Sequence, residues 1–189
     1  MGCLANIQKY SQVLSNHSFD FFVETGTGLG VSLEFALKFN FRELFSVEIV
    51  EELYLKSLER FKSEETVHLT LGKSCDFLDE LLDWIFRSEK ILFWLDAHWP
   101  GADFKIDHED KNNPEIALPL ENELKTIHKW RDGQDTIIID DVRIYEMNPV
   151  HGLVFPREKS MRFVYSLFGQ THRIQRFKED EGYLVLSPI

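Results

Sequence analysis

Apolar residues gather in short runs along the chain, and the segments between the first four runs have the length and periodicity of helices. Five of these runs have the β-branched and aromatic content of strands, at residues 19–23, 44–47, 67–71, 91–95 and 136–139. The run at residues 91–95 is apolar without a break, which is typical of strands buried on both faces of a parallel sheet. The alternation therefore predicts an α/β fold in which helices cover both faces of a mostly parallel sheet.

The last part of the chain has a different pattern. Two strand-like runs, at residues 172–178 and 183–187, are joined by the sequence Glu-Asp-Glu-Gly. A short polar link with glycine between two such runs is a β-hairpin signal. We therefore expect a seven-stranded sheet that ends in an antiparallel hairpin.

The length of 189 residues is close to that of one domain, and a domain of this size buries about 70% of the surface that its unfolded chain exposes. No repeat, low-complexity tract or Pro/Gly/Ser linker divides the chain, so we predict a single domain over residues 1–189. Hydrophobic residues make up 43% of the sequence, which argues against intrinsic disorder. The 32 acidic and 21 basic side chains give a formal net charge of −11, which disfavours a nucleic-acid partner because phosphate binding depends on Lys and Arg.

Location is predicted from cysteine usage and from the length of the apolar runs. Cys3 and Cys75 are too few for a disulfide framework, so we expect a cytoplasmic protein in a reducing compartment. The longest apolar runs are far shorter than the ~20 residues of a membrane-spanning helix, and no export signal is recognised. We predict no membrane association, and the sequence leaves the oligomeric state open.

A glycine motif, Glu-Thr-Gly-Thr-Gly-Leu-Gly at residues 24–30, follows the first predicted strand and precedes a predicted helix at residues 31–39. Glycines at alternate positions allow a tight turn between strand and helix, and they let a ligand approach the backbone. The dinucleotide fingerprint needs a further glycine three residues after the second, and its absence here disfavours NAD. The alternative is a glycine-rich turn that binds nothing.

The motif, together with Glu48 at the end of the second strand, resembles the class I S-adenosylmethionine-dependent methyltransferases. The resemblance implies a three-layer Rossmann-like fold in which Gly26, Gly28 and Gly30 line the methionine part of the cofactor. It also implies that Glu24 helps to hold the amino group and that Glu48 accepts hydrogen bonds from the ribose hydroxyls. The full set of cofactor-binding residues that it implies is Glu24, Thr25, Gly26, Thr27, Gly28, Gly30, Glu48, Ser74, Cys75 and Asp96.

A second group of polar residues follows the fourth and fifth strands. Asp96 and His98 come after one, and Asp140 and Asp141 come after the other, so we expect them to meet at one edge of the sheet. Three carboxylates so close together repel unless a cation neutralises them, and oxygen ligands favour Mg, Mn or Ca over zinc. Because adjacent strand residues point to opposite faces, Asp140 and Asp141 can share one ion only if the chain turns there. The alternative is a set of turn caps and solvated acids without a metal.

This arrangement resembles the metal-dependent small-molecule O-methyltransferases of the catechol and macrocin types. The resemblance implies that Asp96, Asp140 and Asp141 hold a divalent metal, with Mg expected, and that the methyl acceptor is a hydroxyl of a small molecule, a sugar among the candidates. Asp96 and His98 are the predicted catalytic residues. His98 is the preferred general base because its ordinary pKa lies near the operating pH, and Asp96 replaces it if no metal binds.

The polar stretch at residues 99–118 directly follows the fourth strand, on the side where open α/β sheets bind ligands, and we interpret it as an active-site lid. Two other functions remain open from the residues alone. A metal-dependent phosphohydrolase would use Asp96, His98, Asp140 and Asp141, and a non-catalytic protein would bind S-adenosylmethionine without turnover.

Overall fold

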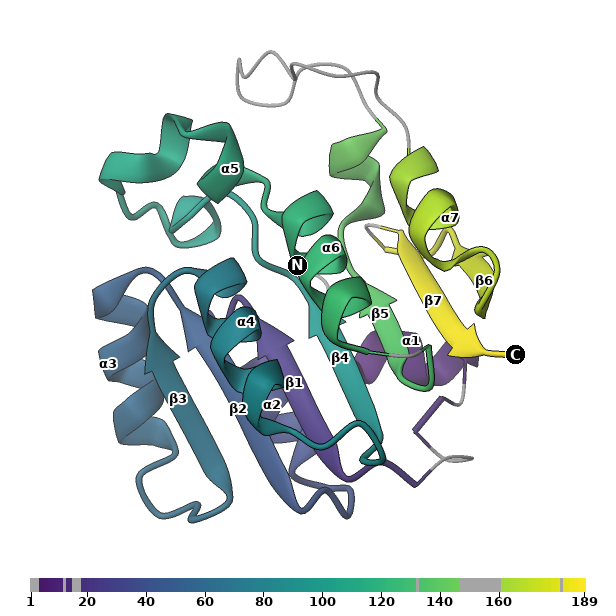
Figure 1. The fold of residues 1–189 in the computed structure, drawn as a ribbon. Coiled ribbons are helices and arrows are strands. Elements are labelled where there is room, and N and C mark those ends of the chain that lie inside the picture. Colours follow the sequence, from purple (N-terminus) through teal and green to yellow (C-terminus); the bar gives the residue numbers. More distant parts are fainter. Residues whose placement is uncertain (1–3, 12, 15–17, 132, 147–160, 181) are drawn as a thin grey trace.

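One seven-stranded sheet forms the centre of the protein in the computed structural model, which describes residues 1–189 apart from 1–3, 12, 15–17, 132, 147–160 and 181 (Figure 1). The strand order across the sheet is β3-β2-β1-β4-β5-β7-β6. The strands are β1 (Phe21–Thr25), β2 (Glu43–Glu48), β3 (Val67–Leu71), β4 (Ile91–Leu95), β5 (Thr136–Ile139), β6 (His172–Phe177) and β7 (Tyr183–Pro188).

The strand directions confirm the predicted sheet. β1 pairs in parallel with β2 and β4, β3 joins β2, and β5 joins β4, whereas β7 runs antiparallel to both β5 and β6. The predicted first strand is displaced by two residues, because β1 begins at Phe21, where its neighbours Glu43 and Ile91 begin their own strands. The start of β1 is thus determined by pairing rather than by the apolar character of Phe19.

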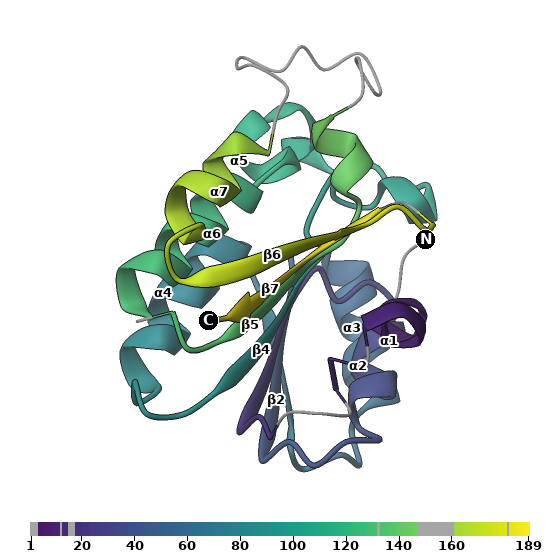
Figure 2. The same ribbon diagram turned by 90° about the vertical axis from the view of Figure 1, so that its right-hand side faces the viewer.

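Helices cover both faces of this sheet, and the edge-on view of Figure 2 separates them into two layers. Helices α4, α6 and α7 lie on one face and α1, α2 and α3 lie on the other. Their bounds are α1 (Leu4–Ser11), α2 (Val31–Ala36), α3 (Glu51–Arg60), α4 (Ser74–Trp84), α6 (Leu120–Trp130) and α7 (Arg162–Phe168). Among the described residues, no helix combines the length and apolar character needed to cross a membrane.

The two faces of β4 supply two separate hydrophobic cores. Phe93 packs with residues of α4, α6 and α7, whereas Trp94 packs with residues of α1 and α2. Both side chains are fully buried, as expected for a strand that is covered on both sides. This explains why the run at residues 91–95 has no polar position.

The segment predicted as a lid contains short helices. The 3₁₀ helices η1 (Ala102–Phe104) and η2 (Glu109–Asn112) are followed by α5 (Pro114–Ala117). The side chain of Asn113 accepts a hydrogen bond from the backbone N–H of Glu115, and Pro114 occupies the first turn. An asparagine cap followed by proline is a standard helix start, so this part of the lid had a sequence signal.

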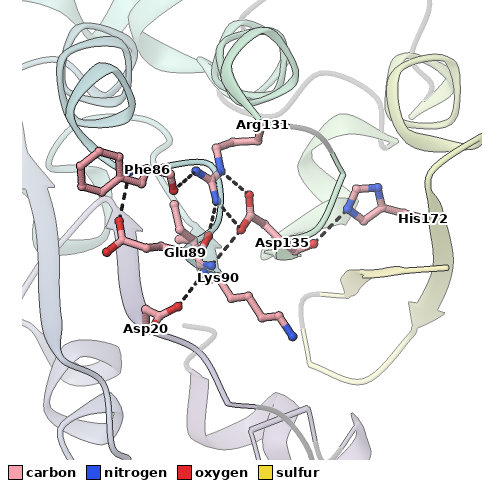
Figure 3. Close-up of polar contacts among 8 residues, drawn as sticks. Asp20, Phe86, Glu89, Lys90, Arg131, Asp135 and His172 are labelled. Atoms are coloured by element: carbon pink, nitrogen blue, oxygen red, sulfur yellow. Dashed lines mark hydrogen bonds and ion pairs between the residues drawn. The ribbon is translucent and has the colours of Figure 1, made fainter.

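A buried ionic cluster lies at the amino ends of β4 and β5, and we name it the amino-edge cluster: Arg131, Asp135 and His172 (Figure 3). The Arg131 guanidinium donates to both oxygens of Asp135, at 2.6 and 3.1 Å, and to the carbonyl oxygens of Phe86 and Glu89. The backbone N–H of Ile91 donates to Asp135 at 2.8 Å. The ring Nε2 of His172 lies 2.9 Å from the Asp135 carbonyl oxygen, so the cluster joins β4, β5 and β6.

Candidate active site

A pocket opens at the carboxyl ends of the strands, around the point where β1 lies between β2 and β4. From β1, the strand order runs to β2 and β3 on one side and to β4 and β5 on the other, so the order reverses at β1. Open α/β sheets bind ligands at such topological switch points. The cavity has a volume of about 320 Å³, within the range of small-molecule sites. Its walls come from the glycine motif, from the ends of β2 and β4, from the start of α4, and from the lid.

The glycine motif makes the turn that forms one wall. The backbone N–H groups of Gly26 and Thr27 both donate to the Val47 carbonyl oxygen, which fastens the turn to the end of β2. Gly26 has a φ of 82°, and a Cβ atom there would lie 2.7 Å from the Asp96 carbonyl oxygen. The turn therefore requires glycine at this position both for its backbone conformation and for its close approach to the segment after β4.

Glu48 is held rigidly at the end of β2. Its Oε2 accepts a hydrogen bond from the Gly28 N–H and its Oε1 accepts one from the Val50 N–H, each at 2.8 Å. Burial raises its pKa, and these backbone donors offset part of that effect. Each carboxylate oxygen keeps a free lone pair, so the side chain can accept further hydrogen bonds from hydroxyl groups in the pocket.

Glu24 lies on the same wall and is 1% exposed. The Ser46 hydroxyl donates to it at 2.6 Å, and Thr27 Oγ1 lies 2.6 Å from the same hydroxyl oxygen. Burial raises the pKa of Glu24 well above its ordinary value, and the nearby Asp96 and Glu48 raise it further. An acid in this environment gains from any positively charged group that enters the pocket.

The far wall begins at α4. Ser74 and Cys75 line the pocket, as does Lys73, which precedes the helix. Burial raises the pKa of the Cys75 thiol to about 12, so the thiol stays protonated at neutral pH. Cys75 is therefore suited to packing against a ligand and unsuited to nucleophilic chemistry.

Asp96, His98 and Asp141 meet beside the pocket. The His98 Nε2 lies 2.7 Å from Asp141 Oδ2 and 3.3 Å from Asp96 Oδ1. Each of the three residues offers one ligand atom, and these atoms all lie within 4.8 Å of one another. Burial alone would lower the pKa of His98, but the two carboxylates raise it to about 10. In this arrangement the imidazole carries a positive charge at neutral pH.

The chain turns directly after β5. Such a turn is the condition under which Asp140 and Asp141 can share one ion. Asp141 has a φ of 52°, a left-handed conformation that is uncommon outside glycine, and its N–H donates to Asp140 Oδ1 at 2.7 Å. Asp140 is 2% exposed and lies near Asp96 and Asp141, outside the closest group of three. Burial raises its pKa well above the ordinary value.

Two residues near these acids have no counterpart in the sequence predictions. Glu123 of α6 and Tyr145 of η3 (Val142–Tyr145) line a narrow cleft behind Asp96, together with His98 and Asp140. We name the acids and imidazole that gather here the carboxyl-edge cluster: Asp96, His98, Glu123, Asp140 and Asp141. Glu123 lies on the buried face of α6. An acid at a helical position that faces the core is unusual, and this feature of the sequence could have identified the residue.

The structure brings most of the predicted cofactor residues to one pocket. Those on its wall are Glu24, Gly26, Thr27, Gly28, Glu48, Ser74, Cys75, Asp96 and the predicted base His98. Thr25 is fully buried behind the wall, and Gly30 begins α2 away from it. Asp140 and Asp141 lie outside the pocket, and the lid contributes residues of its first and last parts, including Phe104 and Asn113.

Comparisons with known proteins were made by sequence and by structure. No protein-family model matches the chain, and no curated protein matches it by sequence. The structure is similar to a candidate caffeoyl-CoA O-methyltransferase from Staphylococcus aureus, with 16% identity, a TM-score of 0.62, and coverage of 100% of this chain and 85% of the other.

Two further solved structures show the same similarity. The SAH-bound methyltransferase PaMTH1 from Podospora anserina has 16% identity and a TM-score of 0.58, over 90% of this chain and 72% of its own. An rRNA methylase from Streptococcus thermophilus has 14% identity and a TM-score of 0.58, over 97% of this chain and 96% of its own. At these identities the likeness concerns the fold, and the predicted Rossmann-like methyltransferase fold is confirmed.

Proposed function

We propose that this protein is an S-adenosylmethionine-dependent methyltransferase that acts on a hydroxyl group of a small molecule, assisted by a divalent cation such as Mg. The observation that carries the proposal is the position of Asp96, which lines the pocket and also belongs to the carboxyl-edge cluster. A donor held in the pocket and an acceptor held by the cluster would therefore meet at one residue. The proposal includes a single domain over residues 1–189 and a cytoplasmic location.

The donor half of the site suits S-adenosylmethionine. Glu48, fixed by the N–H groups of Gly28 and Val50, presents oxygens that can accept two ribose hydroxyls. Glu24 supplies an acid for the ammonium group of the methionine part, close to the glycine turn. S-adenosylmethionine supplies a methyl group that is electrophilic because it is bonded to a sulfonium sulfur. The task of the protein is then to align an acceptor oxygen with that methyl group.

The acid cluster fits a divalent cation by its donor atoms. Asp140 Oδ2 and Asp141 Oδ1 are buried and have no hydrogen-bond partner among the described residues. Each such atom costs about 1–3 kcal/mol, a cost that a bound cation would remove. Asp96, Asp140 and Asp141 would hold the ion, and oxygen ligands favour Mg or Mn. A cation there supplies Lewis-acid chemistry, which lowers the pKa of an acceptor hydroxyl.

His98 is the proposed base, under one condition. It can accept a proton only as neutral imidazole, whereas the carboxylates of Asp96 and Asp141 hold it protonated. A cation held by those carboxylates would weaken the interactions that raise its pKa, so the imidazole would lose its proton more readily and could act as a base. In a site without metal, Asp96 would have to take this role.

The charge of the pocket bears on the acceptor. Acidic side chains outnumber basic ones on its wall: the acids are Glu24, Glu48, Asp76, Asp96, Asp103 and Glu115, and the basic groups are Lys73 and His98. An anionic acceptor would be repelled by this potential, and the net charge of −11 acts in the same direction. These charges support a neutral or positively charged small molecule, a sugar among the candidates, and disfavour a nucleic acid.

The test is transfer of a labelled methyl group from S-adenosylmethionine to a library of phenols and sugars, in EDTA and in Mg or Mn. We expect transfer that requires the cation. Asp141→Asn should reduce transfer by about 100-fold or more, while S-adenosylhomocysteine affinity changes little. Asp83→Asn makes the same chemical change on the exposed surface of α4 and serves as the control.

Other outcomes would replace the proposal. Cofactor binding without transfer to any acceptor would identify a non-catalytic binding protein. Hydrolysis of phosphate esters with metal, in a protein that does not bind S-adenosylhomocysteine, would identify a phosphohydrolase.

A further inference from the structure

Glu123 is the least compensated charged side chain of the carboxyl-edge cluster. It is 1% exposed, and neither of its two carboxylate oxygens has a hydrogen-bond partner among the described residues. Its backbone N–H donates to the Pro119 carbonyl oxygen, so the residue is fixed in the first turn of α6. A buried acid without partners is costly, and its retention calls for a ligand that completes it.

The proposed donor pocket does not supply that ligand. Glu123 does not line the main pocket; it faces the narrow cleft behind Asp96, between α6 and the ends of β4 and β5. Asp96 and His98 line both spaces and separate them. A molecule in the main pocket would therefore meet Asp96 and His98 before it could reach Glu123.

The charges that face Glu123 leave it without a counter-ion. The hydroxyl groups of Ser74 and Thr25 face its carboxylate and lower its pKa, but neither carries a charge. Asp96 and His98 approach from the segment after β4, Tyr145 from η3 and Cys75 from α4. Among the described residues that line the cleft, His98 is the one that can carry positive charge, and its Nε2 already lies between Asp96 and Asp141. The Arg143 guanidinium lies 3.9 Å from Asp141 Oδ1, and this group together with one imidazolium cannot neutralise the four carboxylates of the cluster.

Three of the four unpartnered carboxylate oxygens of the cluster belong to Glu123 and Asp140, which line the cleft. Asp140, whose Oδ2 also lacks a partner, lines the same cleft as Glu123 and Asp96. The cleft leaves no room for a water molecule in this arrangement. Divalent cations bind carboxylate oxygens at about 2.0–2.6 Å, so acids that gather around a narrow space can reach one ion together.

We propose that Glu123 is an additional acidic ligand of the cation site, reaching the ion from α6 through the cleft behind Asp96. The inference rests on the proposed metal site and adds a residue to it, beside the closest group of ligand atoms, which belong to Asp96, His98 and Asp141. The helix α6 then becomes part of the metal site, because its first turn sets the position of a ligand.

The test is binding of Mn²⁺ alone, measured by calorimetry on the full chain without cofactor. Glu123→Gln keeps the shape of the side chain and removes its charge, and we expect at least a tenfold loss of Mn²⁺ affinity. The matched control is Glu121→Gln, on the same helix, where the side chain is partly exposed and pairs with Lys125. That control should bind Mn²⁺ like the parent protein.

The outcomes separate this inference from the proposed function. Unchanged affinity in Glu123→Gln, with weakened binding in Asp141→Asn, would overturn the role of Glu123 and leave the metal site intact. No binding of Mn²⁺ by the parent protein would overturn both. If Glu123→Gln does not fold, Glu123→Asp is the second variant, because it keeps the charge but shortens the side chain by one methylene group. A tenfold loss of Mn²⁺ affinity is again expected, and unchanged affinity would contradict the role of Glu123.

Discussion

Buried charged residues gather at both edges of the sheet, and the two groups differ in how well their polar atoms are partnered. In the amino-edge cluster, Arg131 and Asp135 are each 2% exposed at the side chain, and both Asp135 oxygens accept hydrogen bonds from the guanidinium (Figure 3). In the carboxyl-edge cluster, both oxygens of Glu123 and one each of Asp140 and Asp141 have no hydrogen-bond partner among the described residues.

We interpret the difference as one between a structural role at the amino edge and the proposed binding role at the carboxyl edge. The amino-edge cluster is complete within the chain, so it can join strands without a ligand, although a buried pair of this kind is by itself weak evidence of stability. The carboxyl-edge cluster has excess negative charge and carboxylate oxygens without hydrogen-bond partners, so binding of a cation or of protons stabilises it. Buried charge that lacks partners is thus the better guide to a binding site in this fold.

Removing Arg131 should have the largest effect on stability. Arg131→Ala leaves the buried Asp135 carboxylate unpaired, and we expect a loss of about 3–5 kcal/mol in the free energy of unfolding, measured in urea. Lys129→Ala breaks an exposed pair with Asp79 and should cost less than about 1 kcal/mol. S-adenosylhomocysteine affinity of the folded Arg131→Ala protein should match that of the parent. A large loss of affinity would show that the two edges are coupled.

The pH dependence of stability should come from the other edge. Burial raises the pKa of Glu123 to about 7, so the metal-free native state binds this proton more tightly than the unfolded chain does. The stabilisation is therefore present below the ordinary pKa of a glutamate and is lost as the pH rises through 7. The loss attributable to Glu123 between pH 4 and pH 8 is about 3 kcal/mol.

This prediction is checked by urea unfolding in EDTA across that pH range. The parent protein should lose more stability with rising pH than Glu123→Gln does, while Glu121→Gln should follow the parent. Identical slopes for the parent and Glu123→Gln would mean that Glu123 is not the group whose proton is held.

Most of the fold could be predicted from local patterns. The strands at residues 67–71, 91–95 and 136–139 match β3, β4 and β5, because uninterrupted apolar runs of that length become buried strands. The start of β1 could not be predicted, since it depends on pairing with β2 and β4. The alternation of strand-like and helical segments was enough to predict the fold class, whereas the exact ends of the strands depend on tertiary contacts.

The site could be predicted where its residues follow strands. The glycine motif, Glu48 and Asp96 lie at the carboxyl ends of strands or directly after them, and parallel strands bring such positions to one edge. Glu123 could not be found in this way, because its approach to Asp96 depends on how α6 packs against β4. The same reason hid the pairing of Arg131 with Asp135, in which a helix end meets the start of a strand.

The carboxyl edge is proposed to hold S-adenosylmethionine through Glu48 and the glycine turn. The most direct measurement is a calorimetric titration of S-adenosylhomocysteine into the parent protein and into Glu48→Ala. We expect one binding site in the parent and a loss of about 1.5–3 kcal/mol of binding free energy in the variant, the range for hydrogen bonds to a charged group. No binding by the parent, or equal affinity in a folded Glu48→Ala protein, would contradict it.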